Sequence, residues 1–170
     1  AFDSKVKVIE KKAFENVINS LITIPNSIEY LEPGWLFNSS CSIAVCSKNK
    51  KYSIIDDTLL VQKVNIDEDN YSELNVLSEH YGDTVSIPSF IKSILPFTFN
   101  VIEETNFTIK FSNNVVKFEE NAFNCSRIEN LNISGKLKPT IYIKKNAFNG
   151  SSIESITVSE NSNLIIYIEK

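Results

Sequence analysis

Histidine, glycine and cysteine are scarce in this chain of 170 residues, which contains one histidine, four glycines and three cysteines. Histidine-based catalytic arrangements and glycine-rich phosphate loops therefore have no support in the sequence. The sole histidine, His80, lies in the polar stretch Ser78–Asp83 beside Glu79 and Tyr81. Such a cluster can tune a proton-transfer group, but an exposed loop is the simpler interpretation. We predict that the protein is not an enzyme and uses no cofactor.

The three cysteines, Cys41, Cys46 and Cys125, cannot all pair within one chain. Structural zinc typically needs four cysteine or histidine ligands, so the Cys41 and Cys46 spacing is a weak metal motif, and we predict no metal. The simplest interpretation is that the cysteines are small buried hydrophobic residues. A Cys41–Cys46 disulfide remains the alternative if the protein is secreted.

Excess positive charge and long apolar runs are also absent. The formal net charge is -4 and the pI is about 5.1, which predicts no binding to nucleic acid. No apolar run approaches the roughly 18 residues that span a bilayer, so we predict no direct membrane insertion. The start, Ala1–Lys5, lacks the features of a signal peptide, and the missing initiator methionine indicates a fragment of a longer protein.

What the chain does contain is a strong internal repeat. The segments Val116–Ile133 and Ile141–Val158 share Asn-Ala-Phe-Asn, a serine and Ile-Glu in one register, 25 residues apart. A fixed period of roughly 20 to 50 residues is typical of stacked structural units. The landmark residue of each unit, with Leu36 ambiguous by one position, recurs at Phe14, Leu36, Phe99, Phe123 and Phe148.

Each unit also contains two short apolar clusters rich in β-branched residues, which favour strands. The first strands are expected around Thr23-Ile24-Pro25, Ser86-Ile87-Pro88, Thr108-Ile109, Asn132-Ile133 and Thr157-Val158, with Leu21, Val85, Phe107, Leu131 and Ile156 completing the hydrophobic face. The second strands are expected around Ile28/Leu31, Ile91/Ile94, Val115/Phe118, Ile141/Ile143 and Leu164/Ile166/Ile168.

A unit of this size cannot bury its own hydrophobic face, but it can do so when a neighbour stacks on each side. We therefore predict a mainly β repeat solenoid in which Phe14, Phe99, Phe123 and Phe148 lie inside and stack into a spine. A β-sandwich with evenly spaced strands is the alternative. The identities shared in a single register argue against the sandwich.

One interval, from Asn38 to Tyr81, interrupts the period. The segment Tyr52–Val61 contains two apolar runs around a polar pair of aspartates, which predicts a β-hairpin. The acidic segment Asp67–Glu73 is expected to be a solvated loop. Residues 38–84 are therefore interpreted as one atypical unit that contains a hairpin.

The units resemble the BspA-like leucine-rich repeats, in which an Ile-Thr-Ile-Pro strand is followed by Ala-Phe and a further leucine or isoleucine. The segments Ile22–Leu31, Ala122–Ile128 and Ala147–Ile153 follow this pattern closely. Asn49–Leu59 is similar to the variant unit that forms a hairpin, with Asp57 where glycine is usual. Aspartate tolerates positive φ better than most residues, so the departure leaves a turn feasible.

The resemblance implies a single leucine-rich-repeat domain over residues 1–170, a right-handed coil of about six units with short parallel strands and one hairpin insertion. Members of the family are surface proteins of host-associated bacteria and protozoan parasites, and several are regarded as adhesins. The resemblance thus implies a non-enzymatic, protein-binding domain at the cell surface or outside the cell, with a host matrix or cell-surface protein as its ligand. The alternative is an architectural or cytoplasmic scaffold, with the acidic insertion mediating assembly.

The expected binding surface is the line of outward side chains along the first strands of the units. These residues are Thr23, Ser86, Thr108, Asn132 and Thr157, flanked by Glu129 and Glu154. Such a line can equally be a solvated sheet face, and the two interpretations have equal weight. Tyr30, Tyr71 and Trp35 are alternative contacts because aromatic residues are frequent at binding hot spots, although Trp35 is more typical of a core.

Six Asn-X-Ser/Thr sequences provide possible sites for N-glycans if the protein is extracellular and eukaryotic. A chain rich in asparagine, serine and threonine also produces such sequences by chance. They begin at Asn38, Asn70, Asn106, Asn124, Asn132 and Asn149.

Overall fold

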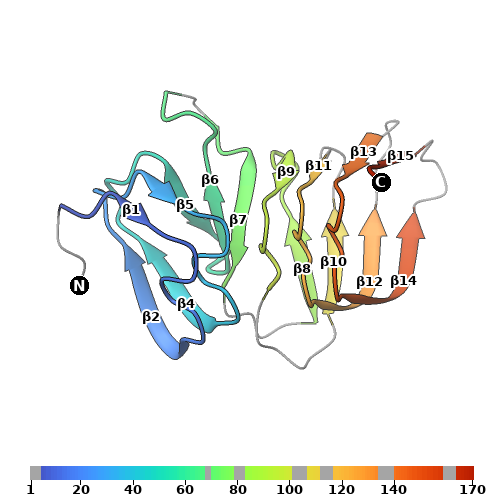
Figure 1. Ribbon diagram of the computed structural model, residues 1–170. Coiled ribbons are helices and arrows are strands. Elements are labelled where there is room, and N and C mark those ends of the chain that lie inside the picture. The colour runs from blue at the N-terminus through green and yellow to red at the C-terminus, as the bar shows by residue number, and fades with distance from the viewer. Residues whose placement is uncertain are drawn as a thin grey trace.

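The computed structural model describes residues 5–67, 70–78, 83–100, 107–111, 117–133, 140–158 and 164–170, and every structural statement refers to them. Within these ranges the regular elements are 15 β-strands, and there is no helix. The strands lie in successive coils that advance from the N-terminus to the C-terminus (Figure 1). The predicted mainly β solenoid is confirmed.

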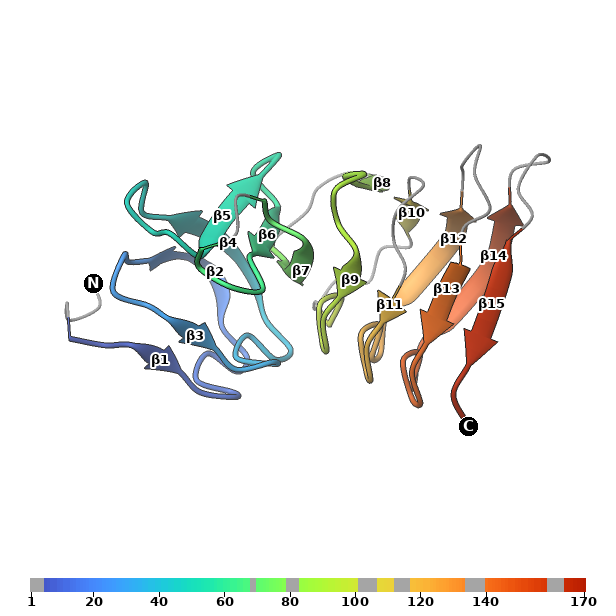
Figure 2. The same cartoon turned by 90° about the horizontal axis from the view of Figure 1, so that it is seen from above.

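Two sheets build the regular part of the solenoid. The four-stranded sheet contains β8 (Thr84–Ile87), β10 (Phe107–Phe111), β12 (Arg127–Ile133) and β14 (Ser152–Val158), all parallel. The parallel part of the seven-stranded sheet contains β9 (Ser93–Ile94), β11 (Lys117–Phe118), β13 (Thr140–Ile143) and β15 (Ile165–Ile168). Figure 2 shows these last four strands side by side. Each coil thus contributes one strand to each sheet.

The N-terminal coils form two smaller parallel pairs. One pair joins β1 (Val8–Ile9) to β3 (Tyr30–Leu31), and the other joins β2 (Ile18–Ile24) to β4 (Ser40–Val45). Alternating residues of β2 and β4 enter the core, because successive side chains of a strand point to opposite faces. The strand β4, which the sequence analysis left unassigned, therefore continues the repeat into the irregular interval.

The irregular interval supplies the predicted hairpin. Strand β5 (Tyr52–Ile55) pairs antiparallel with β6 (Leu59–Gln62), and β6 pairs antiparallel with β7 (Glu73–Leu77). Asp56 and Asp57 have φ values of 49° and 57°, so Asp57 adopts the left-handed conformation that the resemblance required of it. Strand β7 then pairs in parallel with β9 and connects the hairpin to the regular coils.

The strands β6 and β7 separate two hydrophobic cores. Leu59, Val61 and Leu74 pack into the core of the C-terminal coils, whereas Leu60 and Val76 pack into the core of the N-terminal coils. All five residues are buried. Because both faces of these strands are covered, their sequence is a nearly continuous apolar run rather than an alternating one.

The aromatic spine exists for Phe99, Phe123 and Phe148 in the order predicted, whereas Phe14 packs against the N-terminal core. The rings of Phe99 and Phe123 stack with centroids 4.9 Å apart, and those of Phe123 and Phe148 stack at 4.7 Å. Leu36 takes the equivalent place in the second coil and is buried. Trp35, which lies in the position of the repeat alanine, is also buried and contacts Phe14 edge to face at 5.9 Å. The prediction that Trp35 belongs to the core is confirmed.

The turns around the spine contain left-handed backbone at two fixed places, two residues before and two residues after the spine residue; in the turn at Phe99 only the first place belongs to the described residues. Asparagine and glycine occupy most of these places, as expected for positive φ. The residues before the spine are Lys12, Gly34, Phe97, Asn121 and Asn146, and those after it are Asn16, Asn38, Cys125 and Gly150. Backbone bonds such as Phe123 N–H to the Ala147 carbonyl, 2.8 Å, then join neighbouring turns.

Several expected core residues are more exposed than predicted. Leu21 is 67% exposed because Ile22 and Ile24 are the residues of β2 that point inward. Ile156 is 59% exposed although it is in register with buried Leu131, because β14 is the last strand of its sheet. Phe14 and Phe148 are only partly buried for the same reason: each belongs to an outermost turn of the spine.

Two further expectations hold only in part. The acidic segment Asp67–Glu73 is not entirely loop, because Glu73 begins β7, which pairs on both sides; residues 68 and 69 lie outside the described part of the chain. Of the cysteines expected to be small buried residues, Cys41 is buried inside β4 but Cys125 is exposed, and the alternative Cys41–Cys46 disulfide does not form.

Truncation of the central spine residue tests the stacking. Phe123→Ala is expected to lower the free energy of unfolding by about 3 to 5 kcal/mol, because the ring packs against neighbours on both sides. Phe123→Leu is the milder variant if the first does not fold. The control is Phe90→Ala, at a ring that is 40% exposed. Chemical denaturation would measure all three, and equal losses for Phe123→Ala and Phe90→Ala would contradict the stacked spine.

Tyr52 provides a test by pH. Burial raises its pKa from 10.0 to about 12, although the hydrogen bond from the Leu31 amide to its hydroxyl oxygen, 3.0 Å, acts in the opposite direction. Because the folded-state pKa is raised, its contribution to stability is complete below pH 10 and is lost as the pH rises towards 12. The loss is expected to be about 2 kcal/mol.

Tyr52→Phe should be less stable than the parent at pH 8, because it leaves the Leu31 amide without its acceptor. The difference between the two proteins should shrink between pH 10 and 12. Urea unfolding at both ends of this range measures it. A constant difference would show that the Tyr52 hydroxyl titrates as it does in the unfolded chain.

Candidate functional site

The outer face of the four-stranded sheet carries two rows of polar side chains that run across the strands. The first row places Ser86, Lys110, Asn132 and Thr157 in register, one from each strand. The second row places Thr84, Thr108, Asn130 and Ser155 in register. Adjacent strands lie about 4.8 Å apart, so each row is a closely spaced line of hydroxyl, amide and amine groups.

The sequence prediction placed most of this line correctly and misplaced two members. Ser86, Asn132 and Thr157 lie in the first row as expected, but Thr108 lies in the second row, opposite Thr84 and Asn130. Thr23 is exposed on β2 and pairs with Ala44 in a separate sheet. The physical reason is that the pairing register follows the buried residues, which the spacing of Ala-Phe landmarks does not fix to within two positions.

Lys110 is the residue that the sequence analysis missed. It occupies the place in the first row that had been assigned to Thr108, and its side chain is exposed. The centre of the surface therefore carries a positive charge. The signal was present in the alternation of Phe107, Ile109 and Phe111, which are buried and leave residues 108 and 110 facing outward.

Glu129 and Glu154 flank the rows through a shared irregularity. Strand β12 advances from Ile128 to Asn130 while β10 advances from Phe107 to Thr108, so Glu129 is an extra residue relative to β10. The pairing of β12 with β14 passes over Glu129 and Glu154 together. Glu154 occupies the same place in β14, and both glutamates are exposed. The Ser155 hydroxyl donates to the Glu129 carbonyl at 3.0 Å and ties the two irregular strands together. Two adjacent carboxylates therefore border the rows on one side.

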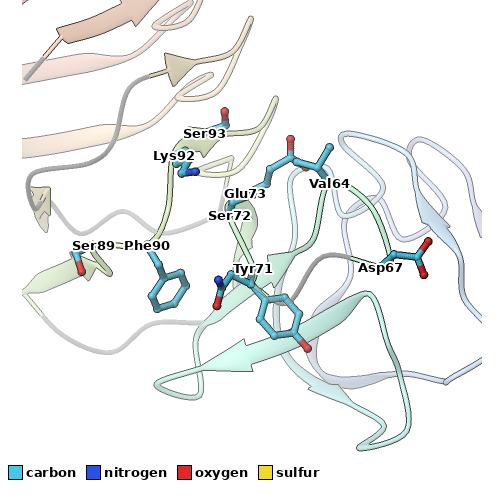
Figure 3. A pocket seen from close by; sticks show the side chains of 10 residues that line it. Val64, Asp67, Tyr71, Ser72, Glu73, Ser89, Phe90, Lys92 and Ser93 are labelled. Carbon is cyan, nitrogen blue, oxygen red and sulfur yellow. The ribbon is translucent and has the colours of Figure 1, made fainter.

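A pocket of about 760 Å³ opens on the other sheet, beside the hairpin unit (Figure 3). Phe90 reaches it from the turn between β8 and β9, whereas Tyr71 reaches it from the segment before β7. Most of the other lining residues are polar. They are Asp67, Asn70, Ser72, Glu73, Ser89, Lys92 and Ser93, together with Val64.

The carboxylate of Glu73 is held in place by a chain of hydrogen bonds that begins in the core. The Trp35 indole donates to Asn75 Oδ1 at 3.1 Å, and the Asn75 amide donates to Gln62 Oε1 at 2.6 Å. The Gln62 amide then donates to Glu73 Oε2 at 2.8 Å. Asn75 can bridge these groups because the pairing of β6 with β7 is irregular beside it. The chain orients one carboxylate oxygen of the pocket and leaves the other for a ligand.

The alternative aromatic candidates separate clearly in the structure. Tyr30 is 46% exposed on β3. Tyr71 lines the pocket, where the Lys63 ammonium lies 5.5 Å from its ring centroid. Trp35 is buried and is therefore not accessible to a partner.

No cluster of metal-ligating side chains occurs in the described part of the chain. The candidate His80 lies outside the described residues. Asn106 does as well. Among the possible glycan sites, Asn124 is only 7% exposed, so a glycan cannot attach to it in the folded protein, whereas Asn38, Asn70 and Asn149 are exposed.

Comparison with protein families finds the BspA type leucine rich repeat region, which matches residues 1–81 and 65–167 in 6 copies. Comparison with curated proteins gives no match. No helix in the described ranges has the length and apolar character needed to cross a membrane.

Two solved structures have a similar fold. The chain is similar to the pneumococcal vaccine antigen PcpA, with a TM-score of 0.54 and 14% identity over 98% of this chain and 60% of that one. It is also similar to a leucine rich cell surface protein from Faecalibacterium prausnitzii A2-165, with a TM-score of 0.52 and 15% identity over 92% of this chain and 52% of that one. At such identities the likeness shows the fold alone. This chain spans little more than half the length of either protein.

Paired cysteines can test the register of the polar rows. In a background where the exposed Cys125 is serine, Lys110→Cys with Asn132→Cys should oxidise to a disulfide, because in-register neighbours lie about 5 Å apart. Thr108→Cys with Asn132→Cys should not, because diagonal positions lie about 7 to 8 Å apart. Mass spectrometry under non-reducing conditions distinguishes the two pairs. Preferential oxidation of the Thr108→Cys and Asn132→Cys pair would contradict the observed register and support the one expected from the sequence.

Proposed function

The chain belongs to the BspA-type leucine-rich repeat family, and from that premise we propose that it is a non-enzymatic domain that binds a protein partner through its four-stranded sheet. The observation that carries the proposal is the in-register first row, Ser86, Lys110, Asn132 and Thr157. Repeat solenoids typically recognise macromolecules along such extended surfaces.

The chemistry of the two rows suits a polar protein surface. Hydroxyl and amide groups both donate and accept hydrogen bonds, so they adapt to main-chain and side-chain groups of a partner. Lys110 adds one positive charge, while Glu129 and Glu154 add negative charge at the border. Charges arranged in this way favour one orientation of a partner over others, which contributes more to specificity than to affinity.

We place the domain at the cell surface or outside the cell, in adhesion or partner recognition. The support is the family, together with a similar fold in a protein described as a leucine rich cell surface protein. A host matrix or cell-surface protein is the proposed class of partner. N-glycans at the exposed Asn38, Asn70 or Asn149 would be compatible with that location, because none of these three lies in the polar rows.

A second candidate is a cytoplasmic or architectural scaffold, and the exposed thiol of Cys125 favours it. Cys46 and Cys125 form no disulfide, and Cys125 is exposed. Exposed free thiols are more typical of reducing compartments than of secreted proteins. Thiol labelling and intact mass of the protein from its native source would decide, since disulfide or glycan mass supports the surface location and free thiols without glycan support the scaffold.

The proposed surface can be tested by reversing its central charge. The 170-residue protein would be titrated against a panel of purified extracellular-matrix proteins by biolayer interferometry. Lys110→Glu and Thr157→Arg should each weaken any saturable binding about tenfold or more, because they alter the charge and shape of the first row. The control is Lys48→Glu, a charge reversal at an exposed site outside the rows.

The proposal fails if no member of the panel binds saturably. It also fails if binding survives both row variants and is lost in the control. Circular dichroism and thermal unfolding of each variant would ensure that a loss of binding does not reflect a loss of the fold.

A further inference from the structure

A second line of outward side chains crosses the seven-stranded sheet, and it differs in chemistry from the polar rows. Register pairing places Glu73 beside Ser93, Ser93 beside Lys117, Lys117 beside Tyr142, and Tyr142 beside Tyr167. The next residues of β7, β9 and β11, which are Leu74, Ile94 and Phe118, point into the core and are buried. The five outward residues therefore form one continuous track, about 19 Å long at the usual strand spacing.

One end of the track is aromatic. The rings of Tyr142 and Tyr167 are nearly parallel, with centroids 5.1 Å apart and an interplanar angle of 11°. They are 49% and 54% exposed. Stacking on each other restricts their rotamers before any ligand arrives, which lowers the entropy lost on binding. The pair offers rigid ring surface and two hydroxyl groups to a ligand.

The other end of the track is the pocket beside the hairpin. Glu73 and Ser93 belong both to the track and to the pocket lining, so the two features are continuous. Phe90 contributes a ring that is 40% exposed. The volume of about 760 Å³ lies in the range of small-ligand sites. Glu73 is pre-oriented by Gln62, which donates to Oε2.

We propose that this track binds an extended, neutral oligosaccharide, with one sugar in the pocket and the chain running towards the tyrosine pair. Sugar rings have apolar C–H faces that pack on aromatic rings, whose faces are electron-rich. Sugar hydroxyls both donate and accept, which matches the carboxylate of Glu73, the hydroxyl of Ser93 and the ammonium of Lys117. A sugar ring with its glycosidic oxygen is comparable in length to one strand spacing.

The charges along the track disfavour an anionic ligand. Asp67 and Glu73 are both in the pocket, where they would repel phosphate or sulfate groups. Lys117 is ion-paired with Glu119, and Lys63 lies against the Tyr71 ring. Lys92 also lines the pocket, but Asp67 and Glu73 outnumber it there.

The geometry also disfavours an extended peptide. Peptides that bind by adding a strand need a free sheet edge, whereas the track crosses the face of the sheet, where backbone groups are already paired. An extended peptide advances about 3.4 Å per residue, which does not match the spacing of about 4.8 Å between the side chains of the track. The carboxylates of Asp67 and Glu73 would still attract a basic peptide, so the test includes one as a competing ligand.

The test uses the 170-residue protein and isothermal titration with cellohexaose, maltohexaose and hexa-N-acetylchitohexaose as neutral probes. A heparin hexasaccharide and a lysine-rich decapeptide serve as charged probes. At least one neutral probe should bind saturably. Phe90→Ala and Tyr167→Ala should each weaken that binding about 3- to 10-fold, because each removes one aromatic surface.

Glu73→Gln keeps an acceptor for Gln62 and should weaken the neutral probe by a similar factor, because it removes a charge-assisted hydrogen bond. Lys110→Glu is the matched control on the other sheet and should leave the neutral probe unaffected. Since Lys110→Glu also tests the protein-binding surface, a failure of that function and a failure of the track can be told apart. Thermal unfolding of each variant would show that a loss of binding does not result from a loss of the fold.

The inference is overturned if none of the neutral probes binds. It is equally overturned if only heparin or the decapeptide binds, or if neutral binding is insensitive to Phe90→Ala, Tyr167→Ala and Glu73→Gln together.

Discussion

The structure depends on contact between a side chain and its own counterpart in the neighbouring coil. Phe123 illustrates this constraint, because it stacks on Phe99 on one side and on Phe148 on the other. No single coil contains both faces of that contact, so no coil can be stable alone, and stability arises between neighbours. Phe148 stacks on Phe123 on one side and is only partly buried. A spine residue therefore needs a neighbouring coil on both sides to be fully buried.

The same constraint explains why the irregular hairpin does not interrupt the protein. A hairpin with one polar face would leave one of the two adjoining cores without an apolar cover. Strands β6 and β7 instead place Leu60 and Val76 in one core and Leu59 and Leu74 in the other, so each core ends against an apolar wall. The turns of the N-terminal and C-terminal coils still contact each other past the hairpin, because the backbone N–H of Asn38 donates to Asn100 Oδ1 at 2.8 Å. The coils are thus continuous along the turns even where the sheets are not.

The sequence predicts those parts of the structure that a recurring residue or a local turn motif marks. The repeat, the spine and the hairpin were predictable because each is marked by residues that recur or by a local turn, as at Asp56 and Asp57. Strand β7 was not, because a strand buried on both faces has no alternation to detect. The place of Lys110 in the first row was missed because the register of β10 follows its buried residues Phe107, Ile109 and Phe111, and the spacing of the landmarks does not fix that register to within two positions.

The two outer faces differ because the inward residues restrict the sequence and the outward residues do not. Along the four-stranded sheet, the outward positions are small and polar around Lys110, so that face can approach a broad polar surface closely. Along the seven-stranded sheet, the outward positions pass from Glu73 to the stacked pair of Tyr142 and Tyr167. Both lines use the same strand spacing, so a single set of core residues positions two surfaces of different chemistry. A substitution on one face can therefore change one surface without altering the other.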